Sequence, residues 1–322
     1  MITGRLRSKL LKKYMIQAAF LFFALSITAQ AQTSWLEKNY KRALTKFSKG
    51  DFDGAIADLN RVIENLIDDK SAFNSKNFND SSDVVVQDFG RVVVVVPRAA
   101  AAYSNRGLAY YAKGEFNEAV ADLEQATMIA PHYAEAFSNL GAALQAKGDV
   151  DQAIENYTQA IKLRPTCASA YHNRGFAFYA QGNPDLAMED LSKAIELDPK
   201  NAMSYLSRGI IWYEKGEWDK AISDYSAAIA TDSRLTRAYN NRGNAYLVKK
   251  DLNAAMEDYE RALQCDSEFS AAYLNRGIVK LMQGKDAEAE KDFRRARALG
   301  SGIDDALDQR IKQAYSLRAA SN

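Results

Sequence analysis

The chain has 322 residues, with 42 lysines and arginines against 41 aspartates and glutamates, a formal net charge of +1. Five of the basic residues and no acidic ones lie in residues 1–31, so the remainder carries 37 basic against 41 acidic residues, a net charge of −4. This mildly acidic balance argues against nucleic acid as the main partner. Only two histidines and two cysteines occur, too few for most metal sites, so no metal and no cofactor is expected.

Residues 1–31 have the pattern of a secretory signal peptide. A basic stretch at 5–13 precedes an apolar run at 15–27, and Ala29-Gln30-Ala31 has the small-x-small form of a cleavage site. The apolar run is short for a membrane-spanning helix. We therefore expect an exported protein, periplasmic or secreted; an uncleaved membrane anchor is the alternative.

The rest of the chain repeats with a period of 34 residues. One glycine recurs at this interval, as Gly107, Gly141, Gly175, Gly209, Gly243 and Gly277. Within residues 168–201, apolar residues recur twice at helical spacing, with Gly182 and Pro184 between the two patterns and Pro199 after the second. Each unit is therefore predicted to be a helical hairpin that buries its apolar faces against its neighbours.

The residues that recur in this unit resemble the tetratricopeptide repeat. The resemblance rests on the pattern Tyr171…Gly175-x-x-Phe178…Gly182…Ala187-x-x-x-Leu191-x-x-Ala194…Pro199. It extends over roughly 240 residues in seven copies. It implies an all-α, right-handed superhelical solenoid of helical hairpins whose first helices line a concave groove.

The units are expected in a fixed order. Residues 36–69 form a degenerate first repeat, and residues 70–99 interrupt the period. Six repeats then fill residues 100–303, and 304–322 is expected to hold a C-terminal capping helix. In the insertion, two valine runs predict a β-hairpin. The alternatives are a flexible loop or a functional edge that pairs with another chain.

Six repeats carry arginine just before the position of the recurring glycine and aspartate 16 residues after that arginine. The arginines are Arg42, Arg106, Arg174, Arg208, Arg242 and Arg276, and the aspartates are Asp58, Asp122, Asp190, Asp224, Asp258 and Asp292. The remaining copy has Leu140 and Asn156, so both charges are lost together. We infer an ion pair between the two helices of each unit, either solvated at the surface or half-buried and bidentate.

Nothing in the sequence indicates catalysis. The HExxH, CxxC, GxSxG and GxxxxGK[ST] patterns are all absent. Cys167 and Cys265 lie about three repeats apart, too far for a disulfide in a stacked array. The carboxylates occupy matching places in successive repeats, as expected for surface patterning. The chain is therefore predicted not to be an enzyme.

Two residues before each glycine stands a row of amides, which is expected to line the groove. The row consists of Asn105, Asn139, Asn173, Asn241 and Asn275, interrupted by Ser207, and Tyr111, Tyr179 and Tyr213 are expected beside it. An amide both donates and accepts, so such a row can hold an extended peptide backbone. It resembles the asparagine ladder of repeat arrays that precede sugar-transferring domains, although no such domain follows. The alternative is that these side chains only pack between repeats.

The sequence thus predicts a non-catalytic scaffold that binds a protein or an extended peptide in the concave groove. The alternative is a membrane-anchored structural component of an envelope or secretion assembly that self-associates through the insertion. Neither the identity of the partner nor the oligomeric state can be read from the residues.

Overall fold

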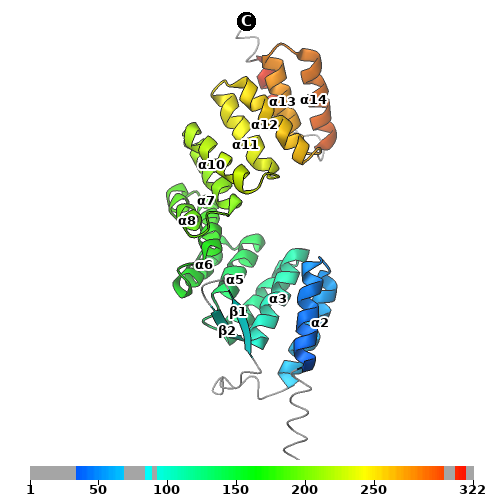
Figure 1. The fold of residues 1–322 in the computed structure, drawn as a ribbon, viewed down its shortest axis with the longest axis vertical. Coiled ribbons are helices and arrows are strands. Elements are labelled where there is room, and N and C mark those ends of the chain that lie inside the picture. The colour runs from blue at the N-terminus through cyan, green and yellow to red at the C-terminus, as the bar shows by residue number, and fades with distance from the viewer. Residues whose placement is uncertain (1–33, 69–83, 89–92, 301–308, 317–322) are drawn as a thin grey trace, which may run out of the picture. The chain divides into compact units, whose positions relative to one another are not determined.

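The structure, a computed structural model, describes residues 34–68, 84–88, 93–300 and 309–316 (Figure 1). The signal-like segment 1–31 and the polar part of the insertion lie outside the described residues. Two compact units divide the chain between Pro165 and Thr166, and each is described by itself.

The first unit contains three helical hairpins and a short antiparallel sheet. The first hairpin pairs helix 34–48 with α2 (Phe52–Asp68). The others pair α3 (Arg98–Lys113) with α4 (Phe116–Ile129), and α5 (Ala134–Lys147) with α6 (Val150–Leu163). Strands β1 (Val84–Asp88) and β2 (Val93–Pro97) pair so that Val84 faces Pro97 and Asp88 faces Val93. The sheet lies where the valine runs predicted a hairpin, and β2 leads directly into α3.

The second unit contains four helical hairpins and a final short helix. The hairpins are α7 (Ala168–Ala180) with α8 (Pro184–Leu197), α9 (Ala202–Glu214) with α10 (Trp218–Thr231), α11 (Thr236–Val248) with α12 (Leu252–Cys265), and α13 (Ser270–Met282) with α14 (Asp286–Leu299). Helix 309–316 follows. Among the described residues the fold is all-α apart from β1 and β2. No helix among them is long and apolar enough to cross a bilayer.

Glycine and proline set the turn inside each hairpin. Gly182 has φ +77° after α7, a left-handed conformation that glycine adopts without strain. Pro184 opens α8, where its missing N–H costs no helical hydrogen bond. The corresponding turn after α11 uses Lys250 at φ +64°.

A second glycine lets the two helices of each hairpin approach closely. A Cβ atom added to Gly209 would lie 2.7 Å from the ring of Tyr225, and one added to Gly277 would lie 2.5 Å from that of Phe293. Both rings are almost completely buried. The recurring glycine is therefore needed because a large side chain of the second helix packs directly against the first.

Helix 309–316 covers part of the last hairpin. Ile311 and Ala314 are buried in one cluster with Leu274 and Phe293, and the ring of Tyr315 meets that of Phe293 edge-on at 6.2 Å. The exposed positions of this helix are polar except for Tyr315. It therefore covers apolar surface on α13 and α14 that the last repeat would otherwise leave in water.

Candidate functional site

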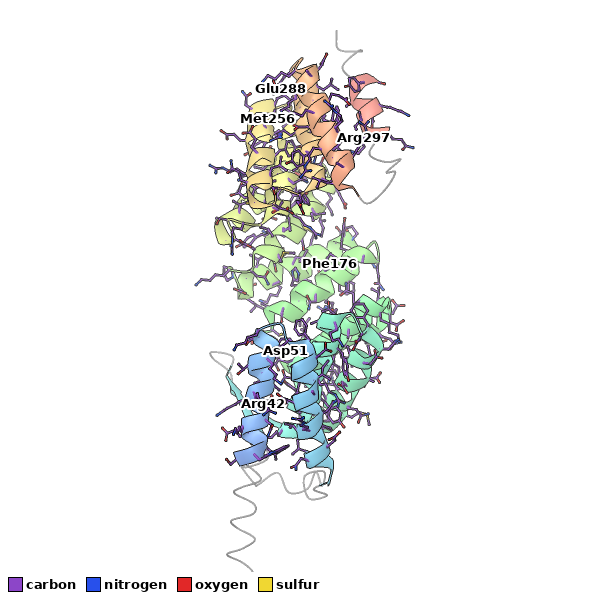
Figure 2. The ribbon with its side chains drawn as sticks, turned by 90° about the vertical axis from the view of Figure 1, so that its right-hand side faces the viewer. Arg42, Asp51, Phe176, Met256, Glu288 and Arg297 are labelled. Carbon is purple, nitrogen blue, oxygen red and sulfur yellow. The ribbon has the colours of Figure 1, made fainter. Side chains whose placement is uncertain are left out.

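The predicted amides lie on the first helices of the hairpins. We call the surface that carries them the first-helix face, and we describe it separately in each unit. In the first unit it belongs to α3 and α5, and in the second unit to α7, α9, α11 and α13. Figure 2 draws the side chains of the described residues, including Phe176 on α7.

In the first unit the amides are partly used inside the protein. The Nδ2 of Asn105 donates to the hydroxyl of Tyr40 at 2.7 Å and to the carbonyl of Ala101 at 2.9 Å. The Nδ2 of Asn139 lies 3.5 Å from the Oγ of Ser104, one repeat earlier. Their Oδ1 atoms accept no hydrogen bond from the described residues, so both amides keep an acceptor for a ligand.

In the second unit one of the predicted amides is not accessible. Asn173 and Asn241 are half-buried, and the Oδ1 of Asn241 accepts from the Nδ2 of Asn240 at 3.3 Å. Asn275, however, is only 1% exposed, because its amide is bonded to Asn240 on one side and to Arg310 on the other. The prediction that Asn275 binds a peptide is therefore wrong, since its amide is buried and both of its polar atoms are already used.

The predicted tyrosines lie on the first helices α3, α7 and α9 and differ in exposure. Tyr111 is exposed and its ring packs against Phe116, whereas Tyr213 is half-buried. The hydroxyl of Tyr179 donates to the carboxylate of Glu214 one repeat later. Burial raises the pKa of Tyr179 to about 12, and the hydrogen bond to Glu214 adds to that shift. This hydroxyl therefore remains protonated at neutral pH.

A small apolar hollow opens on the first-helix face between α7 and α9. It is lined by Phe176, Tyr179, Leu191, Ser207, Ile210 and Ile211. Phe176 is 48% exposed, although it is a large apolar side chain in the middle of a helix. Ser207, which interrupts the amide row, lies at the rim of this hollow. The exposed ring of Phe176 thus offers apolar contact area beside the hydroxyl of Ser207.

Tyrosines of the second helices pack underneath this face, and the sequence analysis did not predict them. Tyr157 and Tyr259 are buried beneath the first helix, and their hydroxyls donate to the side chains of Gln145 and Asn244, each at 2.9 Å. Tyr225 is equally buried, and its hydroxyl has no partner among the described residues. These buried tyrosines could have been predicted from the aromatic residue that stands 16 positions after the repeat glycine in several repeats.

Each predicted arginine–aspartate pair is a bidentate ion pair in the structure. In every case Nε donates to Oδ2 and Nη2 donates to Oδ1, at distances of 2.5–2.9 Å. The aspartate side chains are only 2–8% exposed. The geometry is that of the half-buried alternative, so these pairs belong to the framework of the hairpin.

The same arginines make two further contacts that the sequence did not reveal. The Nη1 of Arg208 donates to Ser192, and that of Arg242 donates to Ser226, in the second helix of the preceding repeat. The guanidinium also lies over the tyrosine three residues earlier in five repeats, at 5.3–6.0 Å from the ring centroid. Arg208 and Arg242 thus each connect three helices.

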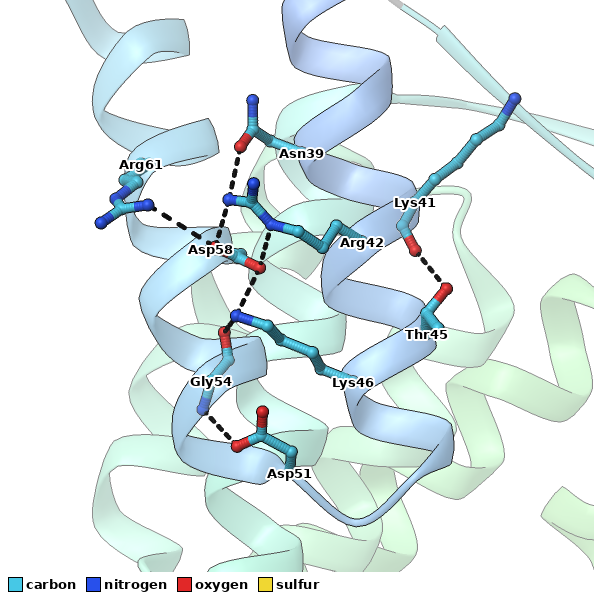
Figure 3. A network of polar contacts seen from close by, with 9 residues as sticks. All are labelled: Asn39, Lys41, Arg42, Thr45, Lys46, Asp51, Gly54, Asp58 and Arg61. Carbon is cyan, nitrogen blue, oxygen red and sulfur yellow. Dashed lines mark hydrogen bonds and ion pairs between the residues drawn. The ribbon is translucent and has the colours of Figure 1, made fainter.

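The first repeat surrounds its aspartate with additional cations (Figure 3). Asp58 accepts from Arg42 and lies 2.9 Å from the Nζ of Lys46 and 3.8 Å from Arg61. Hydrogen bonding to Arg42 lowers the pKa of Asp58 to about 2, against the effect of burial. Asp258, which has Arg242 as its cation, has a raised pKa because burial dominates.

No group of three or more histidine, cysteine or acidic side chains in the described part of the chain could hold a metal ion. The groups that the first-helix face does carry are amides, hydroxyls and apolar side chains.

Comparison with known proteins supports the repeat assignment. Family models of the TPR repeat match residues 107–148, 146–182 and 209–250, and those of the tetratricopeptide repeat match residues 168–201 and 236–269. No curated protein matches the chain.

Several solved structures are similar in fold. A tetratricopeptide repeat protein from Parabacteroides merdae is 19% identical, with a TM-score of 0.58, over 88% of this chain and 99% of that one. The pilF protein of Pseudomonas aeruginosa is 18% identical, with a TM-score of 0.60, over 70% and 98%. A chain of the Cut9–Hcn1 hetero-tetramer of APC/C is 18% identical, with a TM-score of 0.64, over 84% of this chain and 48% of that one. At these identities the likeness concerns the fold alone. The family matches show that residues 107–201 and 209–269 consist of tetratricopeptide repeats, and the described residues form the helical hairpins of that fold.

Proposed function

We propose that the chain is a non-catalytic scaffold that binds an extended segment of a partner protein on the first-helix face. The observation that carries this proposal is the apolar hollow between α7 and α9. There Phe176 remains 48% exposed beside Tyr179 and Ile210, with Ser207 at the rim. An exposed aromatic side chain in a hollow gains contact area when a partner's apolar side chain covers it.

The neighbouring polar groups suit the main chain of such a segment. Asn173 is half-buried one turn before Phe176, and Asn241 lies two repeats further along the same row. An extended chain exposes one N–H and one C=O per residue, and an asparagine side chain can bind both kinds of group. Recognition through the main chain would depend little on the partner's sequence, whereas the hollow would select an apolar side chain.

The proposal is tested by comparing two triple variants in a pull-down from the native compartment. Asn139→Ala, Asn173→Ala and Asn241→Ala together remove three of the four half-buried amides of the row, which also includes Asn105. The matched control carries three alanines on exposed positions of second helices, at Gln125, Gln152 and Glu189. Both variants must first show the thermal stability of the parent. Loss of a partner in the first variant alone supports the proposal; equal retention by both contradicts it.

Export is proposed on separate grounds, from the basic and apolar pattern of residues 1–31. Sequencing the N-terminus of the protein from its native host should find a chain that begins near Gln32. Retention in the membrane fraction with an intact N-terminus would contradict cleavage. If oligomers also disappeared on deletion of residues 84–96, the membrane-anchored, self-associating alternative would be favoured instead.

A further inference from the structure

A line of polar contacts connects helix 309–316 to the last two first helices. The Nδ2 of Asn275 donates to the Oδ1 of Asn240 at 2.9 Å, and the Nη2 of Arg310 donates to the Oδ1 of Asn275 at 2.9 Å. Asn240 and Asn275 are 6% and 1% exposed. Because both polar atoms of Asn275 are engaged, its amide has one orientation, and it holds the guanidinium of Arg310 in place.

The guanidinium of Arg310 differs from those of the repeat arginines. Arg310 is exposed, and no carboxylate of the described residues lies within ion-pair distance of it. Its Nε and Nη1 have no hydrogen-bond partner in the described part of the chain. Each repeat arginine, in contrast, is bonded to its own aspartate through two nitrogens. Within the described part of the chain, Arg310 therefore keeps two donor nitrogens and a positive charge that no carboxylate compensates.

The charge of Arg310 acts on the first-helix face. Burial raises the pKa of Tyr213, and the positive charge of Arg310 opposes that shift. The same charge opposes the stronger effect of burial on the pKa of Tyr259, whose hydroxyl donates to Asn244. Arg310 donates to Asn275 of α13, which is a first helix, and it therefore lies at the α13 part of the first-helix face.

We infer that Arg310 binds the carboxylate of an aspartate or glutamate side chain in the peptide that occupies the first-helix face. This inference rests on the proposed function. A guanidinium and a carboxylate match in charge and in planar shape, and two parallel N–H···O bonds favour an acid over its amide. Arg310 is exposed, is oriented by a buried amide and has no carboxylate partner among the described residues, so its guanidinium can pair with a carboxylate of the peptide.

The test uses the full chain and a pool of random nine-residue peptides with acetylated N-termini and amidated C-termini. Peptides retained by the immobilised protein are sequenced, and the ratio of acidic residues to their amides is compared with that in the pool. For the parent we expect an enrichment of about two- to five-fold, the range typical of an exposed ion pair. Arg310→Gln should abolish the enrichment, and Arg310→Lys should retain part of it, because the charge remains but the planar geometry is lost.

Lys312→Gln provides the matched control, because it removes the same charge from an exposed position on the same helix. It should leave the enrichment unchanged, and all variants should have the circular dichroism spectrum of the parent. Peptide binding without acidic enrichment, or an enrichment that Lys312→Gln removes equally, would overturn the inference and leave the proposed function intact. Absence of peptide binding by the parent would overturn both. A second pool with free C-termini is tested in the same way, and Arg310-dependent retention of peptides from this pool alone would overturn the assignment to a side chain.

Discussion

The guanidinium of Arg242 joins three helices, which makes it a sensitive point for stability. Two of its nitrogens bond to Asp258 and the third to Ser226 in the preceding repeat. Arg242→Leu leaves a buried carboxylate without its cation, and we expect a loss of about 3–5 kcal/mol in the free energy of unfolding. Ser226→Ala removes one hydrogen bond and should cost about 0.5–1.5 kcal/mol. Urea unfolding of both variants measures these losses; equal, small effects would show that the pair is only a surface feature.

The pKa of Asp58 predicts how the first repeat responds to acid. Its folded pKa, about 2, lies below the ordinary value of 3.8. Because the pKa of Asp58 is lower in the folded than in the unfolded protein, its charged carboxylate stabilises the fold at pH values above the unfolded pKa. This stabilisation is lost as the pH falls from about 4 towards 2. Asp58→Asn should therefore be less stable than the parent at pH 7, and the difference should shrink over that interval. Denaturant unfolding of both proteins at several pH values measures this difference in the free energy of unfolding. A difference that stays constant down to pH 2 would contradict the lowered pKa of Asp58.

At the residue scale, the sequence revealed pairs that recur and missed contacts that change from repeat to repeat. Arginine and aspartate appear together at a fixed spacing, and both disappear in the repeat with Leu140 and Asn156, so a link between them could be inferred. The Nη1 of Arg106 donates to Asn60, whereas those of Arg208 and Arg242 donate to serines, so the partner of this nitrogen does not recur as one residue type. The burial of Asn275 depends on Arg310, 35 residues away, and could not be read from the row of amides.

At the scale of the helical hairpin, the repeat glycine should tolerate a methyl group differently in different repeats. A Cβ on Gly209 would meet the rigid ring of Tyr225 at 2.7 Å, whereas one on Gly175 would meet Leu191 at 3.1 Å. Gly209→Ala should therefore cost about 1–3 kcal/mol, and Gly175→Ala should cost less. Thermal unfolding compares the two. A larger loss for Gly175→Ala would mean that the ring of Tyr225 moves more easily than the leucine side chain.

The helical hairpins were predictable because local signals agree with the packing. Period, turn glycines and prolines all place the helix ends, and the structure has helices of 13 to 17 residues there. The repeat that has Leu140 in place of the arginine contains an ion pair that these local signals could not predict. Its first helix is bound instead by an ion pair between Glu135 and Arg164, both half-buried. These two residues occur at these positions in this repeat alone, so no recurrence pointed to them.

At the scale of the whole molecule, the described array is a set of hairpins that depend on their neighbours. Helix 309–316 covers Leu274 and Phe293, so a chain that ends at residue 300 would expose them. We expect faster hydrogen exchange in α13 and α14 of this truncated chain, with little change in α3 and α4, because stability in repeat arrays is largely local. Mass spectrometry of exchanged peptides measures it. An equal change in both regions would show that the chain unfolds as one cooperative body.

The central claim, that partners bind the first helices, is tested most directly by photo-crosslinking in the native host. A benzophenone amino acid replaces either Phe176 on the first-helix face or Leu186 on a second helix; these side chains are 48% and 45% exposed, so the two probes are equally accessible. We predict that the probe at 176 forms a specific crosslink to a partner protein and that the probe at 186 does not. Crosslinks from 186 alone would contradict the claim and place the binding surface on the second helices.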